Sequence, residues 1–316
     1  MTAAIDFTLA RDLGEGPETR FEHARRAARS TEVRVARGAY ARSREWAEAS
    51  ADARYLAVIG AIAATRTRSI VLSHWSAAAV HQLPMVGHWP TEVHVTQPPE
   101  STSRSRNLVV RHTTALAPED VVCVSGLLVT SLARTLVDIC ATRQSVRALV
   151  MTDAAIRLDR KTSSARITKS ALLEAIASRQ PFAGHARARN TIEFAESGAE
   201  SPLESISRLT MRGIACPAPV LQLGHYDDDG LIGYADFAWP DYGVVAEADG
   251  RTKYLDESLR SGRSVEQVIV DEKLREDRIR SLPRKFTRWG WDVGNSPVAL
   301  AAKLRPLGLP VRVRSR

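Results

Sequence analysis

Residues 201–212, SPLESISRLTMR, and residues 234–250, YADFAWPDYGVVAEADG, decide the fold of the last third of the chain. In the first stretch Ser201 is a suitable N-cap, Pro202 occupies the first helical position, and apolar residues recur at helical spacing. This pattern predicts a helix over 202–213. The second stretch has two runs of apolar and aromatic residues on either side of the turn Pro-Asp-Tyr-Gly, which predicts two consecutive strands.

The segments around these stretches complete an ordered series of elements. Residues 219–239 place the turn Asp-Asp-Asp-Gly between two β-rich runs and predict a hairpin. Ser264 and Gln267 form a capping-box pair before a helical run over 265–282, and residues 284–291 read as a further strand. A last helix is expected near 297–304. The predicted order is therefore helix, three strands, helix, strand.

This series, over about residues 196–293, resembles the PD-(D/E)XK restriction-endonuclease-like fold and, within it, Vsr-like nuclease domains of bacteria. The resemblance implies an α-β-β-β-α-β core in which acids on the second and third strands hold a divalent cation. It assigns this role to Asp236 and Glu247, with Glu204 of the first helix as a third ligand. The implied cofactor is Mg²⁺ or Mn²⁺, because such ions take hard oxygen ligands and activate water.

Two positions depart from the family pattern. Asp249 stands where the usual lysine follows the third-strand acid, and Lys253 stands where relatives with this motif carry histidine. We expect Asp249 to assist the cation, and Lys253 either supplies the missing positive charge at the catalytic site or is a surface lysine. The resemblance also implies a set of phosphate contacts, namely Arg208, Lys273, Arg275 and Arg288. The alternatives are an i, i+4 pair between Glu204 and Arg208 that braces the helix, and a pseudo-enzyme that keeps the acids for local structure.

The middle of the chain, residues 51–157, predicts a mixed α+β domain. A helix over 51–64 is followed by the buried run 69–73 and by a helix that opens near Ser73. Three β-rich runs follow, and Ser131 is a suitable cap for a further helix; the runs are 91–97, 107–113 and 121–130.

Three stretches of this region, LSHWSAAAVHQLP, VHVTQ and GLLVTSLARTLVDIC, resemble the AbiE-type (AbiEi) abortive-infection antitoxin family over roughly residues 30–157. Members of that family place a winged-helix DNA-binding segment before this domain. Arg134, Thr135 and Asp138 fit the family pattern, and they form either a structural network or a functional one. The resemblance implies a cognate toxin as partner.

The N-terminal stretch is strongly basic. Residues 20–44 contain eight arginines against Glu22 and Glu32, a local charge of 8 − 2 = +6 in a chain of formal net charge +8. Residues 31–43 predict a short hairpin after a helix over 21–29, so this is a short, incomplete winged-helix-like segment. Such clustered charge attracts phosphate backbones. The DNA contacts expected here are Arg25, Arg26, Arg34 and Arg37.

Several other classes of protein are disfavoured. No apolar run is long enough for a membrane span, and the N-terminus lacks the pattern of a signal peptide, so we expect a cytoplasmic protein with no membrane partner. Cys123, Cys140 and Cys216 are far apart and read as buried thiols. The histidines at 74, 81, 88 and 94 have no metal-ligand spacing and are expected to be packed or hydrogen-bonded.

The sequence thus predicts a multidomain α+β protein. Its parts are a basic segment over 1–50, an antitoxin-like domain over 51–157, a basic connector over 158–195 and a nuclease-like domain over 196–316. The leading hypothesis is a Mg²⁺-dependent DNA endonuclease linked to phage defence or a toxin–antitoxin system. The alternatives are a non-catalytic DNA-binding regulator or antitoxin of a type IV toxin–antitoxin system, and an antitoxin that acts through protein contacts alone.

Overall fold

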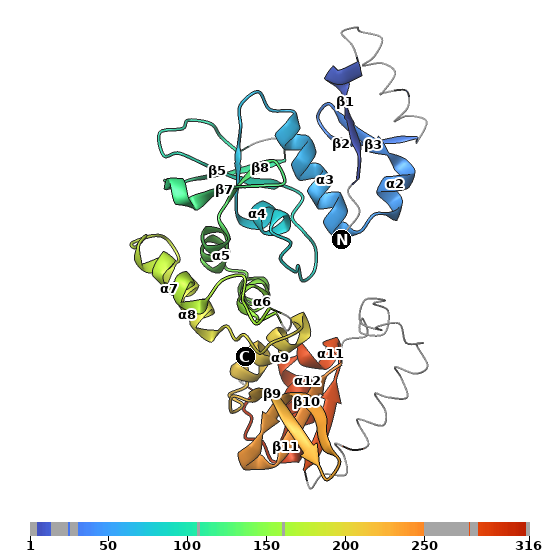
Figure 1. Cartoon of the computed structure of the whole chain (residues 1–316), viewed down its shortest axis with the longest axis vertical. Helices are drawn as coiled ribbons and strands as arrows, with labels where there is room; N and C mark the ends of the chain where they lie inside the picture. The colour runs from blue at the N-terminus through green and yellow to red at the C-terminus, as the bar shows by residue number, and fades with distance from the viewer. Residues whose placement is uncertain are drawn as a thin grey trace. The chain divides into compact units, whose positions relative to one another are not determined.

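The computed structural model describes residues 5–13, 25, 31–105, 108–159, 162–249, 278 and 284–313. It is an α+β chain of two compact units (Figure 1). The first unit comprises Met1–Met151 and Ile167–Glu193, and the second comprises Thr152–Arg166 and Phe194–Arg316. No helix among the described residues is long and apolar enough to cross a bilayer.

The first unit begins with a small antiparallel sheet. Its strands are β1 (Phe7–Leu9), β2 (Glu32–Ala36) and β3 (Ala39–Arg42), in the spatial order β1-β3-β2. The 3-10 turn η1 (Ala10–Leu13) follows β1, and α2 (Ser43–Glu48) follows β3. The β2–β3 turn places Gly38 at φ +75°, a conformation that suits glycine. The sheet packs on α3 (Ala51–Ala64), where a Cβ at Gly60 would come within 3.2 Å of the Phe7 ring. The expected hairpin is confirmed, whereas the helix expected over 21–29 lies outside the described residues apart from Arg25.

A mixed five-stranded sheet forms the rest of the core of this unit. Its order is β6-β5-β4-β8-β7, with β4 paired parallel to β8 and β5 parallel to β6. One apolar cluster of buried residues runs from Ile5 to Val129 and joins both sheets through α3. The strands are β4 (Val71–Leu72), β5 (Val93–Gln97), β6 (Val109–Thr113), β7 (Val121–Val124) and β8 (Leu127–Thr130).

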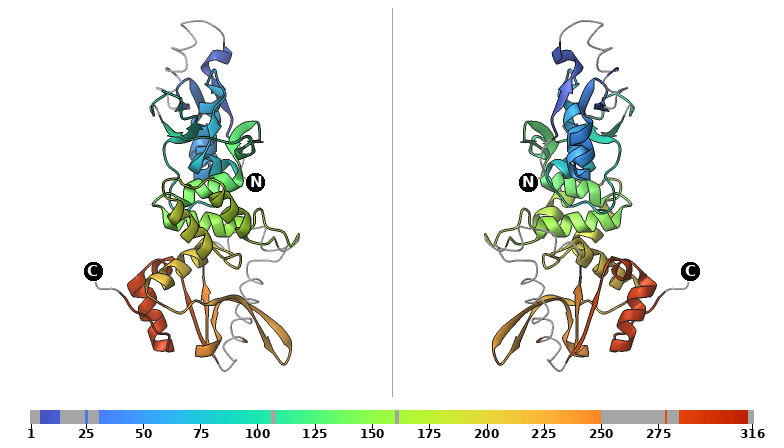
Figure 2. Two further views of the ribbon diagram at one scale, coloured as in Figure 1. Left: turned by 90° about the vertical axis from the view of Figure 1, so that its left-hand side faces the viewer. Right: turned by 90° about the vertical axis from the view of Figure 1, so that its right-hand side faces the viewer.

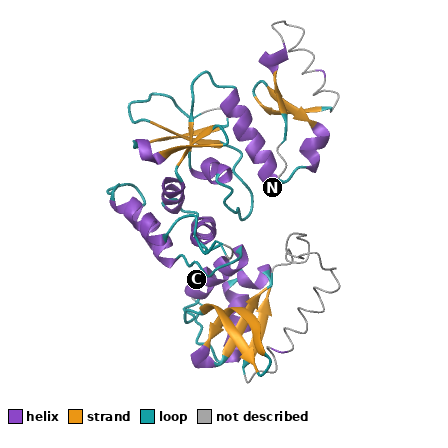
Figure 3. Ribbon diagram, viewed as in Figure 1, coloured by secondary structure: helices purple, strands orange, loops and turns teal. Residues whose placement is uncertain are grey.

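Helices accompany this sheet in the first unit (Figure 3). Helix α4 (His74–Val80) packs on α5 (Leu132–Cys140), and α5 packs on α7 (Lys169–Ala177). The Ser131 hydroxyl caps α5 as expected, accepting from the Arg134 N–H at 3.3 Å. Helix α8 (His185–Phe194) falls in the stretch expected as a connector, and α6 (Ser145–Ile156) contributes to both units. The 3-10 turn η2 (Pro118–Asp120) precedes β7.

Two expectations for the first unit need correction. The run 121–130 forms a hairpin instead of one strand, because Ser125 and Gly126 adopt positive φ angles of +49° and +78°. Cys140 and Cys216 are buried as expected, but Cys123 is exposed. It lies on β7, the edge strand of its sheet, where Val122 and Cys123 are both exposed.

The second unit has a four-stranded sheet of order β12-β11-β10-β9. Its strands are β9 (Val220–Asp227), β10 (Gly230–Trp239), β11 (Val244–Ala248) and β12 (Lys285–Trp289), with η3 (Pro240–Tyr242) before β11. Pairing is antiparallel except between β11 and β12, which are parallel.

An apolar layer joins this sheet to helices α9 (Pro202–Gly213) and α12 (Pro297–Leu304), which Figure 2 shows beside the strands. Phe237 stacks on Trp289 at 5.4 Å between ring centroids. The short α11 (Trp291–Gly294) and η6 (Arg305–Leu307) flank α12. The expected helix over 202–213, the hairpin, the third and fourth strands and the last helix are confirmed. The helix expected over 265–282 lies outside the described residues, except for Arg278.

Candidate functional site

Asp236 and Glu247 meet where the central strands of the second sheet stop pairing. The β10–β11 register pairs Phe237 with Ala246, so Asp236 and Glu247 are the next residues along the two strands. Both side chains are buried, with 7% and 6% of their surface exposed. The Ala248 backbone N–H donates to Asp236 Oδ2 at 2.8 Å, which fixes this carboxylate against β11.

Gln222 joins Glu204 to Asp236. Its Nε2 donates to Asp236 Oδ1 at 3.2 Å and to Glu204 Oε2 at 3.4 Å. The Glu204 carboxylate also accepts from the Glu200 backbone N–H at 2.9 Å, in front of α9. Sequence reasoning missed Gln222, although the register that pairs Leu221 with Phe237 and Leu223 with Ala235 places it opposite Asp236. The turn pairs Gly230 with Asp227, and a register shift between Leu231 and Gly233 is needed to bring Gln222 opposite Asp236, so the turn alone does not predict this partner.

Glu247 is paired with a cation across the parallel strands. The register sets Glu247 beside Arg288, and Arg288 Nη2 lies 2.9 Å from Glu247 Oε2. The other terminal nitrogen of Arg288 lies 3.8 Å from Asp249 Oδ2. Arg288 thus neutralises the acids at the end of β11. It lies in the same cluster as Glu247, one of the expected metal ligands.

The donor chemistry of this cluster suits Mg²⁺, which prefers carboxylate oxygens. Nevertheless, the part of the chain that the structure describes contains no group of three or more His, Cys, Asp or Glu residues arranged to hold a metal ion. Glu204, Asp236 and Glu247 each accept hydrogen bonds from N–H donors instead. The described arrangement does not form a closed metal site, and the Mg²⁺ or Mn²⁺ expectation stays a prediction. Lys253, Lys273 and Arg275 lie outside the described residues.

Arg208 is buried, with 6% of its surface exposed, and it contacts protein groups. Its Nη1 donates to Asp153 Oδ2 at 3.0 Å and its Nη2 to the Phe194 carbonyl at 2.6 Å. Burial raises the pKa of Asp153 to about 6, because the cost of desolvating the carboxylate exceeds the attraction of Arg208. The alternative weighed from the sequence paired Arg208 with Glu204, whereas the structure pairs Arg208 with Asp153. Phosphate contact by Arg208 stays a prediction.

The basic patch expected at the N-terminus is partly described. Arg34 and Arg37 are exposed on the β2–β3 hairpin, while Val35 and Ala36 between them are buried. Arg25 is exposed, and Arg26 lies outside the described residues. Because its apolar residues face the core, the hairpin presents its guanidiniums to solvent.

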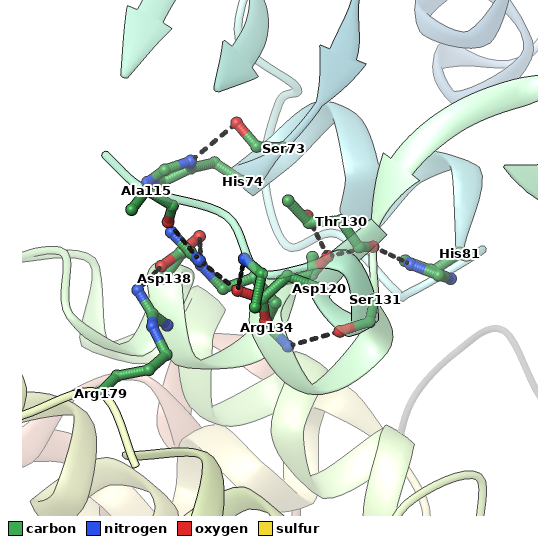
Figure 4. Close-up of polar contacts among 12 residues, drawn as sticks. Ser73, His74, His81, Ala115, Asp120, Thr130, Ser131, Arg134, Asp138 and Arg179 are labelled. Atoms are coloured by element: carbon green, nitrogen blue, oxygen red, sulfur yellow. Dashed lines mark hydrogen bonds and ion pairs between the residues drawn. The ribbon is translucent and has the colours of Figure 1, made fainter. Parts of the chain in front are cut away.

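A buried polar network centres on Arg134 of α5, which is 1% exposed (Figure 4). Arg134 Nε donates to Asp138 Oδ2 at 2.9 Å, and Nη1 donates to Asp120 Oδ2 at 2.7 Å and to the Ala115 carbonyl at 3.1 Å. Arg179, after α7, donates from Nη2 to Asp138 Oδ1 at 3.2 Å. The sequence pointed to Arg134 and Asp138, but Asp120 and Arg179 are distant along the chain and were missed. Thr135 bonds Thr130 at 2.7 Å between the hydroxyl oxygens.

Three histidines cluster beside this network. His74 stacks on His112 at 3.6 Å between centroids, and His94 Nδ1 lies 2.9 Å from His112 Nε2. Desolvation lowers the pKa of all three, that of His94 to about 4, and repulsion among the rings adds to the shift for His74 and His94. His81 bonds the Thr130 carbonyl at 2.8 Å. His74, His81 and His94 are thus packed or hydrogen-bonded as expected, while His88 is exposed.

Comparison with known proteins places this geometry in context. Residues 72–194 match the family model of the AbiEi antitoxin C-terminal domain. This segment is similar to that domain. The AbiEi-like segment, residues 72–194, contains Arg134, Asp138, Arg179 and the three clustered histidines.

Two curated proteins of Mycobacterium tuberculosis are also similar to the chain. Uncharacterized protein MT2308 of strain CDC 1551 / Oshkosh and Uncharacterized protein Rv2248 of strain ATCC 25618 / H37Rv are each 33% identical over 165 residues. The match covers 48% of this chain and spans 59% of each relative's length. The crystal structure of the RV2827C protein from Mycobacterium tuberculosis matches with a TM-score of 0.37 and 15% identity, over 70% of this chain and 83% of that one.

The lowered pKa of His94 predicts that the folded protein loses stability as the pH falls. The folded pKa of His94, about 4, lies below the value near 6.5 of the unfolded chain. The unfolded chain therefore binds more protons between these values, so this contribution to stability is complete above pH 6.5 and is lost as the pH falls toward 4. We expect His94→Asn, which keeps a polar group near the Nδ1 position, to reduce this loss in urea unfolding measured from pH 7 to 4.

The exposed His88 supplies the control for this experiment, because His88→Asn should leave the wild-type pH profile unchanged. A His94→Asn profile that runs parallel to the wild-type profile would show that His94 is equally basic in the folded and unfolded chain.

Proposed function

We propose that this chain is a DNA-binding antitoxin or regulator of a toxin–antitoxin or abortive-infection system of type IV. The observation that carries the proposal is the match of residues 72–194 to the AbiEi antitoxin C-terminal domain. The matched segment includes β4 to β8 with helices α4 to α8, and most of it is a folded part of the first unit and not an isolated motif. The partners we propose are the promoter DNA of its own operon and a cognate toxin protein.

The described surface supports the DNA-binding part of this proposal. The β2–β3 hairpin precedes the AbiEi-like segment, and its buried residues belong to the same apolar cluster as the five-stranded sheet. Arg34 and Arg37 are exposed on this hairpin. Arginine side chains on an exposed hairpin neutralise phosphates and release counterions, the sequence-independent component of DNA binding.

Paired arginines beside the hairpin allow a matched test. Arg42 and Arg44 have similar exposure but are engaged by Glu45 and Glu48 at 3.3 and 2.9 Å. The affinity for DNA falls as the salt concentration rises. We expect the double variant Arg34→Gln/Arg37→Gln to make the plot of log affinity against log salt less steep by about 1.8, or ~0.9 for each phosphate that is no longer neutralised. Arg42→Gln/Arg44→Gln should change it less. Fluorescence anisotropy with a duplex from the chain's own upstream region, and with an unrelated duplex, measures both.

Two results would count against the proposal. A wild-type slope in the Arg34→Gln/Arg37→Gln variant would remove these two arginines from the DNA interface. The absence of binding to either duplex at low salt would remove the DNA-binding function itself.

A Mg²⁺- or Mn²⁺-dependent endonuclease of the PD-(D/E)XK, Vsr-like class is our second candidate. It is supported by the position of Asp236 next to Glu247 at the end of their paired strands and by Gln222, which bridges Asp236 to Glu204. In this candidate Glu204, Asp236 and Glu247 are the ligands, and Asp249 and Lys253 assist catalysis. In this candidate Arg288 leaves its ion pair with Glu247 when DNA binds and then contacts a phosphate of the DNA.

Thermal unfolding tests the second candidate without an assumed substrate. Millimolar Mg²⁺ or Mn²⁺ should raise the melting temperature of the wild-type protein, because an ion that binds only the folded state stabilises it. Asp236→Asn and Glu247→Gln should abolish the rise, and the exposed Asp241→Asn should retain it. Without any ion-dependent rise, and without cleavage of duplex, single-stranded or mismatched DNA, the endonuclease candidate fails. DNA binding through the hairpin is expected to survive all three substitutions.

A further inference from the structure

The buried guanidinium of Arg134 has one terminal nitrogen left over. Its Nε and Nη1 are fully engaged by Asp138, Asp120 and the Ala115 carbonyl. Its Nη2 is buried, and no described residue accepts a hydrogen bond from it. A guanidinium has five N–H donors, and an open pair of donors in a side chain that is 1% exposed is costly unless a ligand or water meets it.

Arg179 repeats this arrangement on the other side of the same carboxylate. Its Nη2 donates to Asp138 Oδ1, while Arg134 donates to Oδ2 of that residue. The two guanidiniums are therefore held next to each other by one carboxylate. Arg179 Nη1 is also buried and has no acceptor among the described residues. Two buried guanidinium nitrogens that have no acceptor among the described residues thus belong to arginines that share one carboxylate.

The histidine cluster adjoins these open groups. The charges of Arg134 and Arg179 lower the pKa of His74, and the charge of Asp138 raises that of His112, so both rings lie within reach of the charges of this network. Figure 4 shows His74 with the residues of the network. Thr96 is the register partner of His112, and its buried hydroxyl likewise has no partner among the described residues. His74 and His112 are mostly buried, and each keeps a small part of its surface exposed to solvent.

The backbone at His74 is also unusual. Its φ angle is +49°, a left-handed conformation that is unfavourable for a residue with a Cβ. A residue stays in such a conformation only where the surrounding structure holds it there. Here the conformation places the imidazole on His112 and next to Ser73, whose hydroxyl is 3.1 Å from His74 Nδ1.

We propose that the first unit binds a single phosphate group between the guanidiniums of Arg134 and Arg179 and the imidazoles of His74 and His112. The open groups are all hydrogen-bond donors or imidazole nitrogens, and planar guanidiniums match the oxygens of a phosphate. A metal ion does not fit, because cationic donors surround the position and no metal-holding group occurs among the described residues. The site is independent of the function proposed above, since neither antitoxin activity nor DNA cleavage requires it.

The charge balance of the site is compatible with an anion. Arg134 and Arg179 are already balanced by Asp120 and Asp138. An added phosphate is compensated by a proton on one of the neighbouring histidines, which burial keeps neutral while the site is open. The ligand is either free inorganic phosphate or the terminal phosphate of a nucleotide or nucleic acid, and these share the same chemistry.

Calorimetric titration of the full chain at constant ionic strength tests the site. The probes are inorganic phosphate, adenosine 5′-monophosphate, and one short oligonucleotide with either a 5′-phosphate or a 5′-hydroxyl end; sodium chloride is the reference salt. We expect saturable binding of at least one phosphate monoester or of inorganic phosphate. Arg179→Gln should weaken it at least tenfold, and Arg179→Lys, which keeps the charge, should weaken it less. The exposed Arg143→Gln removes an equal charge elsewhere in this unit and should bind like the wild type.

The probes also identify the source of the phosphate. Saturation by inorganic phosphate assigns the site to a free ion, and binding that requires the 5′-phosphate of the oligonucleotide assigns it to a nucleic-acid end. Either result supports the site. Equal binding of the 5′-hydroxyl and 5′-phosphate oligonucleotides with no binding of the small phosphates overturns it, as does wild-type affinity in a folded Arg179→Gln protein.

Discussion

The buried ion network of Arg134 is the interaction on which the first unit depends. A guanidinium that is 1% exposed is stable only when its charge and its donors are met inside the protein. Asp138 lies one turn further along α5, Asp120 belongs to η2, and Arg179 follows α7. One side chain therefore fixes a helix of the unit to the segment before β7, and its partner carboxylate fixes the same helix to α7. Removing Arg134 or Asp138 takes one of its two ion-pair partners from the buried charge that remains.

The second unit is organised by a different constraint: one face of its sheet packs in an apolar layer, and the other face carries polar side chains. Phe237 and Trp289 stack within the core, and Asp236 and Arg288 are the residues directly before them on the same strands. Because neighbouring residues of a strand point to opposite faces, packing the aromatic rings sets the acids and the arginine on the other face. The endonuclease candidate for this unit rests on that alternation. The carboxylates are satisfied by backbone N–H groups, by Gln222 and by Arg288, a state compatible with a structural role as well as with a site that opens for an ion.

Local chemistry made most elements of the fold predictable. The cap at Ser201 and the proline after it defined α9, and the Asp-Asp-Asp-Gly turn defined the β9–β10 hairpin. Chemistry that depends on distant partners was not predictable in the same way. Arg134 and Asp138 are four residues apart and were recognised, whereas Asp120, Arg179 and His112 come to the same place only through the order of strands and helices. The partner of Arg208 was unpredictable for the same reason. Arg208 pairs with Asp153 of α6, which is distant from it along the sequence, and not with the nearby Glu204.

In the AbiEi-like segment the buried guanidinium of Arg134 is therefore the structural centre. In our proposal it also donates hydrogen bonds to the bound phosphate. A double-mutant cycle in urea unfolding, with Arg134→Leu, Asp138→Leu and the double variant, tests its structural role most directly. Arg134→Leu leaves Asp138 with Arg179 as its ion-pair partner, and Asp138→Leu leaves Arg134 with Asp120. Each single variant thus takes one partner from a buried charge, so we predict that the double variant is more stable than additivity requires, with a coupling free energy of about 2 kcal/mol or more. Additive effects, with a coupling free energy within ~0.5 kcal/mol of zero, would contradict this role and would mean that Arg134 and Asp138 contribute independently to the fold.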